Sequence, residues 1–239
     1  MLEFHKKVLM VGYGSVARSL IPDWAPEFDA DSSPSVAFDA AAARRDLASA
    51  GWKDAGSSWI PKGSKDPLAL TLVSADEASN PVAFETARAV AAAWRSIGLQ
   101  VTHEAVPAAD LLAKRVGPGD YEAAVLPLVI GLDPDLYPLL ASSQTRSGGA
   151  NVSGVQDAAL DKLLAAARAP GGTEVRLAAY ATLQARLASQ LYILPLAFRD
   201  DVVVLRSTVE GPAPRAIAGP GDRFWDVLTW RLADASTGG

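Results

Sequence analysis

A strand–helix–strand pattern in the first half of the chain constrains the fold more than any other feature. Residues 68–74 (LALTLVS) alternate apolar and polar side chains as a strand does, and Asn80-Pro81 combines a capping residue with a first-turn proline. Apolar residues then recur at helical spacing before Gly98, which predicts a helix from Pro81 with one apolar face: Phe84, Ala87, Ala91, Trp94 and Ile97. Residues 99–106 (LQVTHEAV) are typical of a second strand. These lengths predict a right-handed crossover in a parallel sheet.

The segment that follows extends this pattern. Residues 107–116 predict a helix, and GPGD at 117–120 predicts a turn. Apart from Glu122, residues 121–130 form an apolar run, as in a strand that is buried on both faces. We therefore expect an α/β fold with a mixed, mostly parallel sheet flanked by helices.

Helices are expected on both sides of this segment in the sequence. Asp39 is placed to cap an alanine-rich helix, and Asp157 is placed to cap another with an apolar stripe. A third helix is predicted from Thr173, after Pro-Gly-Gly. Beyond it, residues 192–198 and 202–205 resemble two strands joined by a charged turn.

The composition limits the class of protein. With 239 residues, 49% of them hydrophobic, the chain can bury a large core as one large domain or two small ones. The 22 Lys and Arg residues against 27 Asp and Glu give a net charge of −5, and the basic residues do not cluster, so no nucleic-acid partner is expected. With no Cys and only His5 and His103, the sequence offers neither disulfides nor a multi-histidine metal site. We expect no cofactor.

A glycine motif near the start suggests one enzymatic hypothesis. The residues Gly12-Tyr13-Gly14-Ser15-Val16-Ala17 match G-x-G-x-x-A, a loop whose backbone amides approach a pyrophosphate. A dinucleotide fold also needs a long helix after this loop and an acidic residue at a strand end about 20 positions on. Pro22 and Pro26 restrict that helix to about two turns, and Asp29 and Asp31 lie in a loop rich in Ser and Pro. We prefer an irregular glycine loop and keep a small NAD-type oxidoreductase as the alternative.

Two carboxylates follow the predicted strand at 121–130, where Asp133 and Asp135 flank Pro134. Ligands bind at the carboxyl ends of strands in open α/β sheets, so the segment from Leu132 to Tyr137 is well placed for polar recognition. Asp133 is also a plausible cap for a short helix that begins at Pro134, and the two roles are compatible. Carboxylates two residues apart do not face each other across a sugar, so a retaining glycosidase pair does not fit.

Other candidates for chemistry are weaker. His103 lies within a predicted strand, and no G-x-S-x-G elbow accompanies it, so a nucleophilic triad is not favoured. Asn151 and Ser153 lie in a glycine-rich loop where they could donate to a ligand, but a turn-forming role is preferred. A hydrolase that uses Asp133 and a stand-alone interaction domain stay open as competing classes.

Several segments match those of one known family in the same order. The most specific stretch is GLDPDLYPLLASSQ at 131–144, followed by NVSG at 151–154. Further pieces lie at 12–22, 41–54, 68–74, 96–101, 119–126, 159–168 and 191–204. In this order the chain resembles the C-terminal lobe of family 5 extracellular solute-binding proteins, the oligopeptide, dipeptide and nickel receptors of ABC importers. The glycine loop is similar to the family's own, which weighs against a dinucleotide site.

The resemblance implies a type 2 periplasmic-binding-protein-like lobe over residues 1–210, with residues 211–239 as a closing segment that returns to the first lobe. It also implies a secreted or lipid-anchored receptor rather than an enzyme. Such a receptor captures a peptide or another small polar solute and delivers it to ABC permease subunits. By this resemblance the following residues border the ligand cleft: Tyr13, Ile130, Gly131, Leu132, Asp133, Tyr137, Asn151 and Ser153.

Two features depart from the family. Peptide-binding members often carry an Asp before the D-P turn, in a W-x-x-D-Y segment that pairs with the peptide's amino terminus. This chain has Val129-Ile130-Gly131-Leu132 there, so no α-amino anchor is expected at that position. The family's first lobe and an export signal are also missing. We therefore expect an excised or truncated lobe with weak or no ligand affinity, since closure needs contacts from both lobes.

Overall fold

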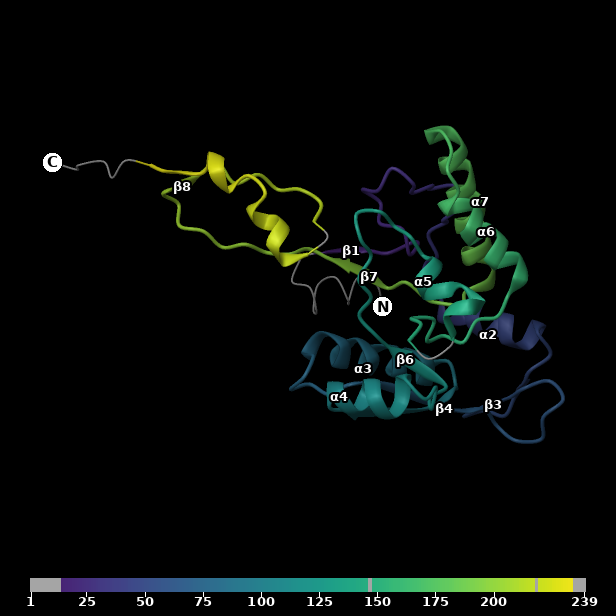
Figure 1. Ribbon diagram of the computed structural model, residues 1–239. Coiled ribbons are helices and arrows are strands. Elements are labelled where there is room, and N and C mark those ends of the chain that lie inside the picture. The colour runs from purple at the N-terminus through teal and green to yellow at the C-terminus, as the bar shows by residue number, and fades with distance from the viewer. Residues whose placement is uncertain (1–13, 146–147, 218, 234–239) are drawn as a thin grey trace.

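The computed structural model, which describes residues 14–145, 148–217 and 219–233, contains a three-stranded parallel sheet (Figure 1). β4 (Ala69–Ala75) lies between β5 (Gln100–Val106) and β6 (Ala123–Val125). Along β4 and β5 the register runs from Ala69 opposite Gln100 to Ala75 opposite Val106. The predicted parallel pairing of these two segments is therefore confirmed.

Helical segments cover both faces of this sheet. α3 (Pro81–Ser96) is capped by Asn80, whose side-chain oxygen accepts the Ala83 N–H at 3.0 Å, as predicted. Its apolar face packs on one side of the sheet in a cluster of Leu72, Ala87, Val90, Ala91 and Val101. α4 (Ala108–Asp110) continues into a π-helix, η2 (Leu111–Val116), which packs on the other side against Val73 and Ala75. The helix expected at 107–116 is thus present, but most of it is a π-helix.

The strand predicted over residues 121–130 is wrong in length and in environment. β6 ends at Val125 and lies at the edge of the sheet, where β4 is its only partner among the described residues. The last β4–β6 pair is Ser74 with Val125, and Pro127 has no N–H to continue a ladder. Residues 126–131 have no regular secondary structure, and Val129 is 83% exposed.

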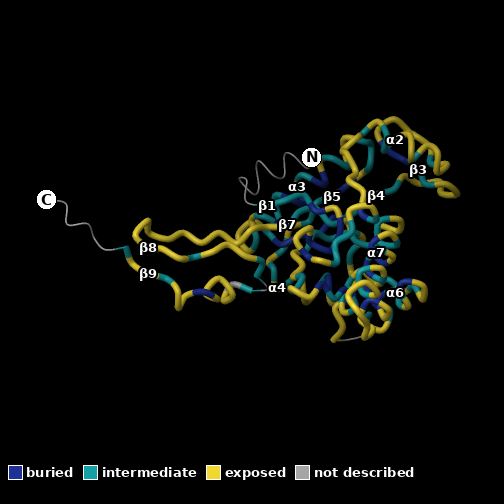
Figure 2. Tube along the Cα trace, turned by 90° about the horizontal axis from the view of Figure 1, so that it is seen from above, coloured by how far each residue is buried: buried dark blue, intermediate teal, exposed yellow. Residues whose placement is uncertain are grey.

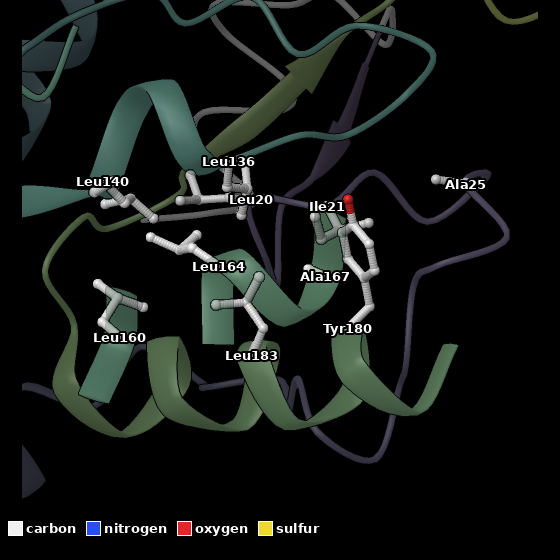
Figure 3. Packing of buried hydrophobic residues seen from close by; sticks show 11 residues of the cluster. Leu20, Ile21, Ala25, Leu136, Leu140, Leu160, Leu164, Ala167, Tyr180 and Leu183 are labelled. Carbon is white, nitrogen blue, oxygen red and sulfur yellow. The ribbon is translucent and has the colours of Figure 1, made fainter. Parts of the chain in front are cut away.

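A second apolar core forms around a helix pair (Figure 3). α6 (Ala158–Arg168) and α7 (Thr173–Gln190) pack together beside α5 (Tyr137–Leu140), which is followed by the 3-10 helix η3 (Ser142–Thr145). Asp157 caps α6 as predicted, accepting N–H bonds from Ala159 and Leu160. The largest fully buried side chains of this core are Ile21, Leu136, Leu140, Leu160, Leu164, Tyr180 and Leu183.

A small hairpin lies between the first helix and the sheet in the sequence. α2 (Ala40–Ser49) is capped by Asp39 as predicted, and none of its residues is buried. It is followed by β2 (Lys53–Asp54), which pairs in an antiparallel manner with β3 (Trp59–Ile60). Trp59 is only 3% exposed, so its side chain packs in the interior.

The expected pair of strands at 192–198 and 202–205 does not form. β7 (Ala197–Arg199) instead pairs with β1 (Gly14–Val16), with Ser15 opposite Phe198. The two strands are far apart in the sequence. Residues 202–205 have no regular structure and are exposed. Residues 18–21 form bends, so the short helix allowed after the glycine motif is absent.

Beyond β7 the chain extends away from the rest of the molecule (Figures 1 and 2). We call residues 202–217 and 219–233 the C-terminal arm. It contains β8 (Val209–Glu210), paired with β9 (Arg231–Leu232), and the 3-10 helices η4 (Pro220–Phe224) and η5 (Val227–Thr229). Most of the arm is exposed, as the yellow tube in Figure 2 shows.

Candidate functional site

The candidate site begins where the chain leaves the carboxyl end of β6. Residues 126–132 (LPLVIGL), here called the exit segment, run from the sheet toward α5 (Figure 1). Within the part of the chain that the structure describes, none of their backbone N–H or C=O groups has a hydrogen-bond partner. The side chains are apolar, and Leu128, Val129 and Leu132 are exposed. An extended, unpaired backbone of this kind is free to bond to a ligand.

The turn at Asp133-Pro134, here called the D-P turn, follows the exit segment directly. Asp133 O accepts the Asp135 N–H at 2.8 Å, and Asp135 Oδ1 accepts the Tyr137 N–H at 3.1 Å. α5 begins at Tyr137 rather than at Pro134, and Asp133 makes no capping bond to it. The proposed capping role of Asp133 is therefore wrong: Asp135 supports the first turn instead, while the Asp133 side chain is 71% exposed.

Arg176, on α7, joins the D-P turn to two other parts of the chain. Its guanidinium donates to Asp133 Oδ1 at 2.6 Å and to Glu27 Oε1 at 2.7 Å. It also donates to the Ala167 carbonyl at 3.4 Å and to the Tyr180 hydroxyl at 3.3 Å. The hydrogen bond to Glu27 is the main cause of a raised pKa of Arg176. Burial opposes it, the hydrogen bond to Asp133 adds to it, and the guanidinium stays charged.

Tyr180 supports the same turn from within the core. Its ring is 1% exposed, and its hydroxyl donates to the Pro134 carbonyl at 3.3 Å. Burial raises the pKa of Tyr180 to about 12, so the hydroxyl remains a donor at neutral pH. Figure 3 shows this side chain among the apolar residues of α6 and α7.

Tyr137 is held by a second cation. The Arg168 guanidinium lies 4.5 Å from the centre of the Tyr137 ring and 3.2 Å from Asp135 Oδ2. The Tyr137 hydroxyl lies 3.2 Å from Ser143 Oγ. One face of the ring is therefore covered by the guanidinium.

Asn151 bonds to Ser153 and to backbone carbonyls at the end of α5 and in its own loop. The Asn151 side chain is 4% exposed, and its amide donates to the carbonyls of Leu140, Ala141 and Val155 at 2.9 to 3.2 Å. Ser153 Oγ donates to Asn151 Oδ1 at 2.9 Å. This geometry agrees with the turn-forming role preferred from the sequence. Tyr13, the other loop residue predicted for the site, lies outside the described residues.

His103 is the remaining chemical candidate. Its Nε2 lies 2.8 Å from Ser74 Oγ, but Ser74 is completely buried and its hydroxyl also donates to the Ala75 carbonyl. Burial, followed by the charge of Arg95, lowers the pKa of His103. No carboxylate among the described residues bonds to the ring, so the described residues do not assemble a triad here.

The described residues contain neither a cluster of metal ligands nor a helix that could span a membrane. In residues 14–145, 148–217 and 219–233, no three His, Asp or Glu side chains gather as metal ligands would. None of the helices in those ranges combines the length and apolarity that crossing a bilayer requires.

Comparison with known proteins identifies the family. Residues 3–150 match the model of the bacterial extracellular solute-binding proteins, family 5 Middle. Because this match spans more than half of the chain, the protein belongs to this family. No curated protein matches the chain.

Solved structures of solute-binding proteins share the fold. The oligopeptide-binding protein AppA of Bacillus subtilis, in complex with a nonapeptide, is 22% identical with a TM-score of 0.71, over 97% of this chain and 45% of its own. NikZ of Campylobacter jejuni, in complex with Ni(L-His), is 20% identical with a TM-score of 0.73, over 96% and 46%. DppA of Helicobacter pylori, in complex with the peptide STSA, is 21% identical with a TM-score of 0.74, over 97% and 42%. The chain thus spans less than half the length of these proteins.

The site contains residues that the sequence did not indicate. Arg176 and Glu27 are 149 positions apart, and no local motif relates either to the D-P turn. The one available signal is the spacing of Arg176, Tyr180 and Gln184 at every fourth residue, which places three polar or aromatic side chains on one face of α7.

Proposed function

We propose that this chain is the ligand-capturing lobe of an extracellular solute-binding protein that serves an ABC importer, and that it has no catalytic role. The observation that carries the proposal is the exit segment, whose backbone is unpaired among the described residues and whose Val129 is 83% exposed. It follows a parallel strand at its carboxyl end, where α/β folds bind ligands. Family membership supports the assignment to solute binding.

A peptide or another small solute with amide groups is the ligand class that the exit segment favours. An extended ligand backbone can bond to the N–H and C=O groups of an unpaired segment, and side chains on both can pack together. Two of the solved relatives, AppA and DppA, hold peptides. Ile130 offers no carboxylate for an α-ammonium group, and the Asp133 carboxylate is already paired with Arg176. We infer that the ligand is held here by backbone bonds and apolar contacts.

The predicted cleft residues have different roles in this proposal. Ile130, Gly131 and Leu132 contact the solute, while Asp133 and Tyr137 fix the adjoining turn. Asn151 and Ser153 shape the neighbouring loop, and Tyr13 contributes from the glycine loop.

The C-terminal arm supports a closing role for the last part of the chain. A segment with so many exposed apolar side chains is expected to pack against another surface. We propose that residues 211–239 return to the first lobe of the receptor, with ABC permease subunits as further partners. The exposed apolar residues of the arm are Val202, Val203, Val204, Leu205, Phe224, Trp225, Val227, Leu228 and Leu232.

Calorimetric titration of the chain with tetra-alanine, and separately with NADH, tests this function. Half a cleft provides only part of the differential contacts of a closed receptor, so we expect tetra-alanine to bind more weakly than micromolar and NADH to give no binding heat. Micromolar binding of NADH would support the oxidoreductase alternative. Sub-micromolar binding of tetra-alanine would contradict the proposal that a second lobe completes the site.

A further inference from the structure

One face of α7 contacts both the D-P turn and a distant loop. Arg176, Tyr180 and Gln184 are spaced by four residues, so their side chains project from the same face. Gln184 is 1% exposed; its Nε2 donates to the Glu27 carbonyl at 2.8 Å, and its Oε1 accepts from Asp29 N and Ser33 Oγ. The loop at 27–33 is therefore fixed to the same helix as the D-P turn.

The contact between Arg176 and Asp133 differs from an ordinary surface ion pair. Two long, mobile side chains gain little from pairing in water. Here Glu27, whose side chain is 12% exposed, and the Tyr180 hydroxyl already orient the guanidinium, so Asp133 meets a donor that is fixed in place. The planar guanidinium donates in several directions at once, which an ammonium group does not reproduce.

Tyr180 fixes the next residue of the turn. Its hydroxyl bonds to the carbonyl of Pro134, while the guanidinium of Arg176 holds the side chain of Asp133. Two consecutive residues at the end of the exit segment are thus attached to one rigid helix by side chains one turn apart. The exit segment itself has no backbone bond to a described residue; the Ile130 side chain packs against the second apolar core, and the contacts of Arg176 and Tyr180 fix the backbone where the segment ends.

We infer that Arg176 and Tyr180 are positioning residues for the exit segment: they fix the Asp133–Pro134 turn and so present the unpaired backbone of residues 128–132 in one orientation. The fixing of the turn is a property of the free chain. Its consequence for solute binding rests on the proposed function, because a preordered segment loses less conformational freedom when a ligand binds.

Backbone amide order parameters from NMR relaxation test the inference on the free chain. Arg176→Met keeps the aliphatic stem and removes every donor. In this variant we expect the order parameters of Ile130, Gly131 and Leu132 to fall from about 0.85 to below about 0.6. Tyr180→Phe removes the bond to Pro134 and the acceptor of one Arg176 N–H, but it keeps the pairing of Arg176 with Asp133 and should give a smaller fall at the same residues. Arg176→Lys should rescue the order only in part.

Arg186→Met is the matched control. Arg186 lies on the same helix with similar exposure and bonds to Asp157 and Tyr192 rather than to the turn. We expect it to leave the exit segment unchanged even where it lowers the melting temperature. Should Arg176→Met fail to fold, Asp133→Ala serves instead, because it removes the acceptor of the Arg176 N–H and its 71% exposed side chain can be changed without disturbing the core. Unchanged order at residues 130–132 in the folded variants, or an equal loss in Arg186→Met, would overturn the inference.

A titration with tetra-alanine separates this inference from the proposed function. If the wild-type chain shows shifts at residues 128–132, Arg176→Met should weaken the apparent affinity several-fold while Arg186→Met does not; equal affinities would overturn the consequence for binding. If the wild-type chain shows no shift there, the proposed function fails. The order parameters of the free variants still decide whether Arg176 and Tyr180 position the segment.

Discussion

The indole N–H of Trp59 donates to the carbonyl of Ile97, with 2.6 Å between Nε1 and oxygen. This bond attaches the β2–β3 hairpin to the last turn of α3. Gly98 follows with a φ of +93°, and a Cβ added there would lie 3.1 Å from the same indole nitrogen. The glycine therefore meets two requirements, a left-handed backbone and a close approach of the ring.

Gly98→Ala should lower the free energy of unfolding by about 1 to 3 kcal/mol, because the new side chain is strained and crowds Trp59. Gly63→Ala is the control, since Gly63 has a φ of +84° but no neighbour within 4 Å of an added Cβ. Urea unfolding of both variants checks the prediction. If Gly63→Ala is as destabilising as Gly98→Ala, the contact with Trp59 has no measurable effect.

Asn80→Ala should destabilise the chain by about 1 kcal/mol, because the Ala83 N–H loses its acceptor at the start of α3. Asn80→Ser retains a capping oxygen and should recover most of that stability. Equilibrium unfolding in urea measures both variants. Equal stabilities of the Ala and Ser variants would show that the cap does not contribute.

A buried leucine and an exposed leucine should differ in how much stability is lost when each is replaced by alanine. Leu183 is completely buried between α6 and α7, whereas Leu228 on the C-terminal arm is 97% exposed. Leu183→Ala should therefore cost about 2 to 5 kcal/mol, and Leu228→Ala should change stability by less than about 0.5 kcal/mol. A substantial loss in Leu228→Ala would mean that the arm packs against this chain.

His103 should make stability depend on pH near neutrality. Its pKa is lowered in the folded chain by burial and by Arg95, so the folded state favours the neutral ring. Its contribution to stability is therefore complete above the ordinary pKa near 6.5 and is lost as pH falls toward the lowered folded value. His103→Gln should remove this dependence, measured as the difference in unfolding free energy between pH 7.5 and pH 5.5, conditions chosen to bracket the pKa of about 6.5. An identical difference in wild type and variant would contradict it.

The elements that the sequence predicted correctly depend on local chemistry. Asp39, Asn80 and Asp157 each accept the N–H bonds of the helix that follows, so residue type and position suffice to place those helix starts. The alternation in residues 68–74 and the turn at Gly98 likewise act within a few residues. The resemblance to one family added the family assignment, which the match over residues 3–150 confirms.

The errors arose where distant partners decide the structure. Residues 123–130 are apolar, yet the strand ends at Val125, just before Pro127, and lies at the edge of the sheet beside β4. β7 pairs with β1, which no pattern within residues 192–205 indicates. The positions of Arg176 and Glu27 beside Asp133 depend in the same way on the packing of α7. A hydrophobic pattern indicates that a segment is buried, but it does not indicate which other segment covers it.

The most direct test of the account is an amide NMR titration of the chain with tetra-alanine at millimolar concentrations, where weak binding is still visible. The account predicts that chemical-shift changes concentrate in residues 128–133, and that Val129→Asp reduces them while Leu228→Ala does not, because only Val129 lies on the exit segment. Changes concentrated elsewhere, or a spectrum that does not respond, would contradict the claim that this segment captures the solute.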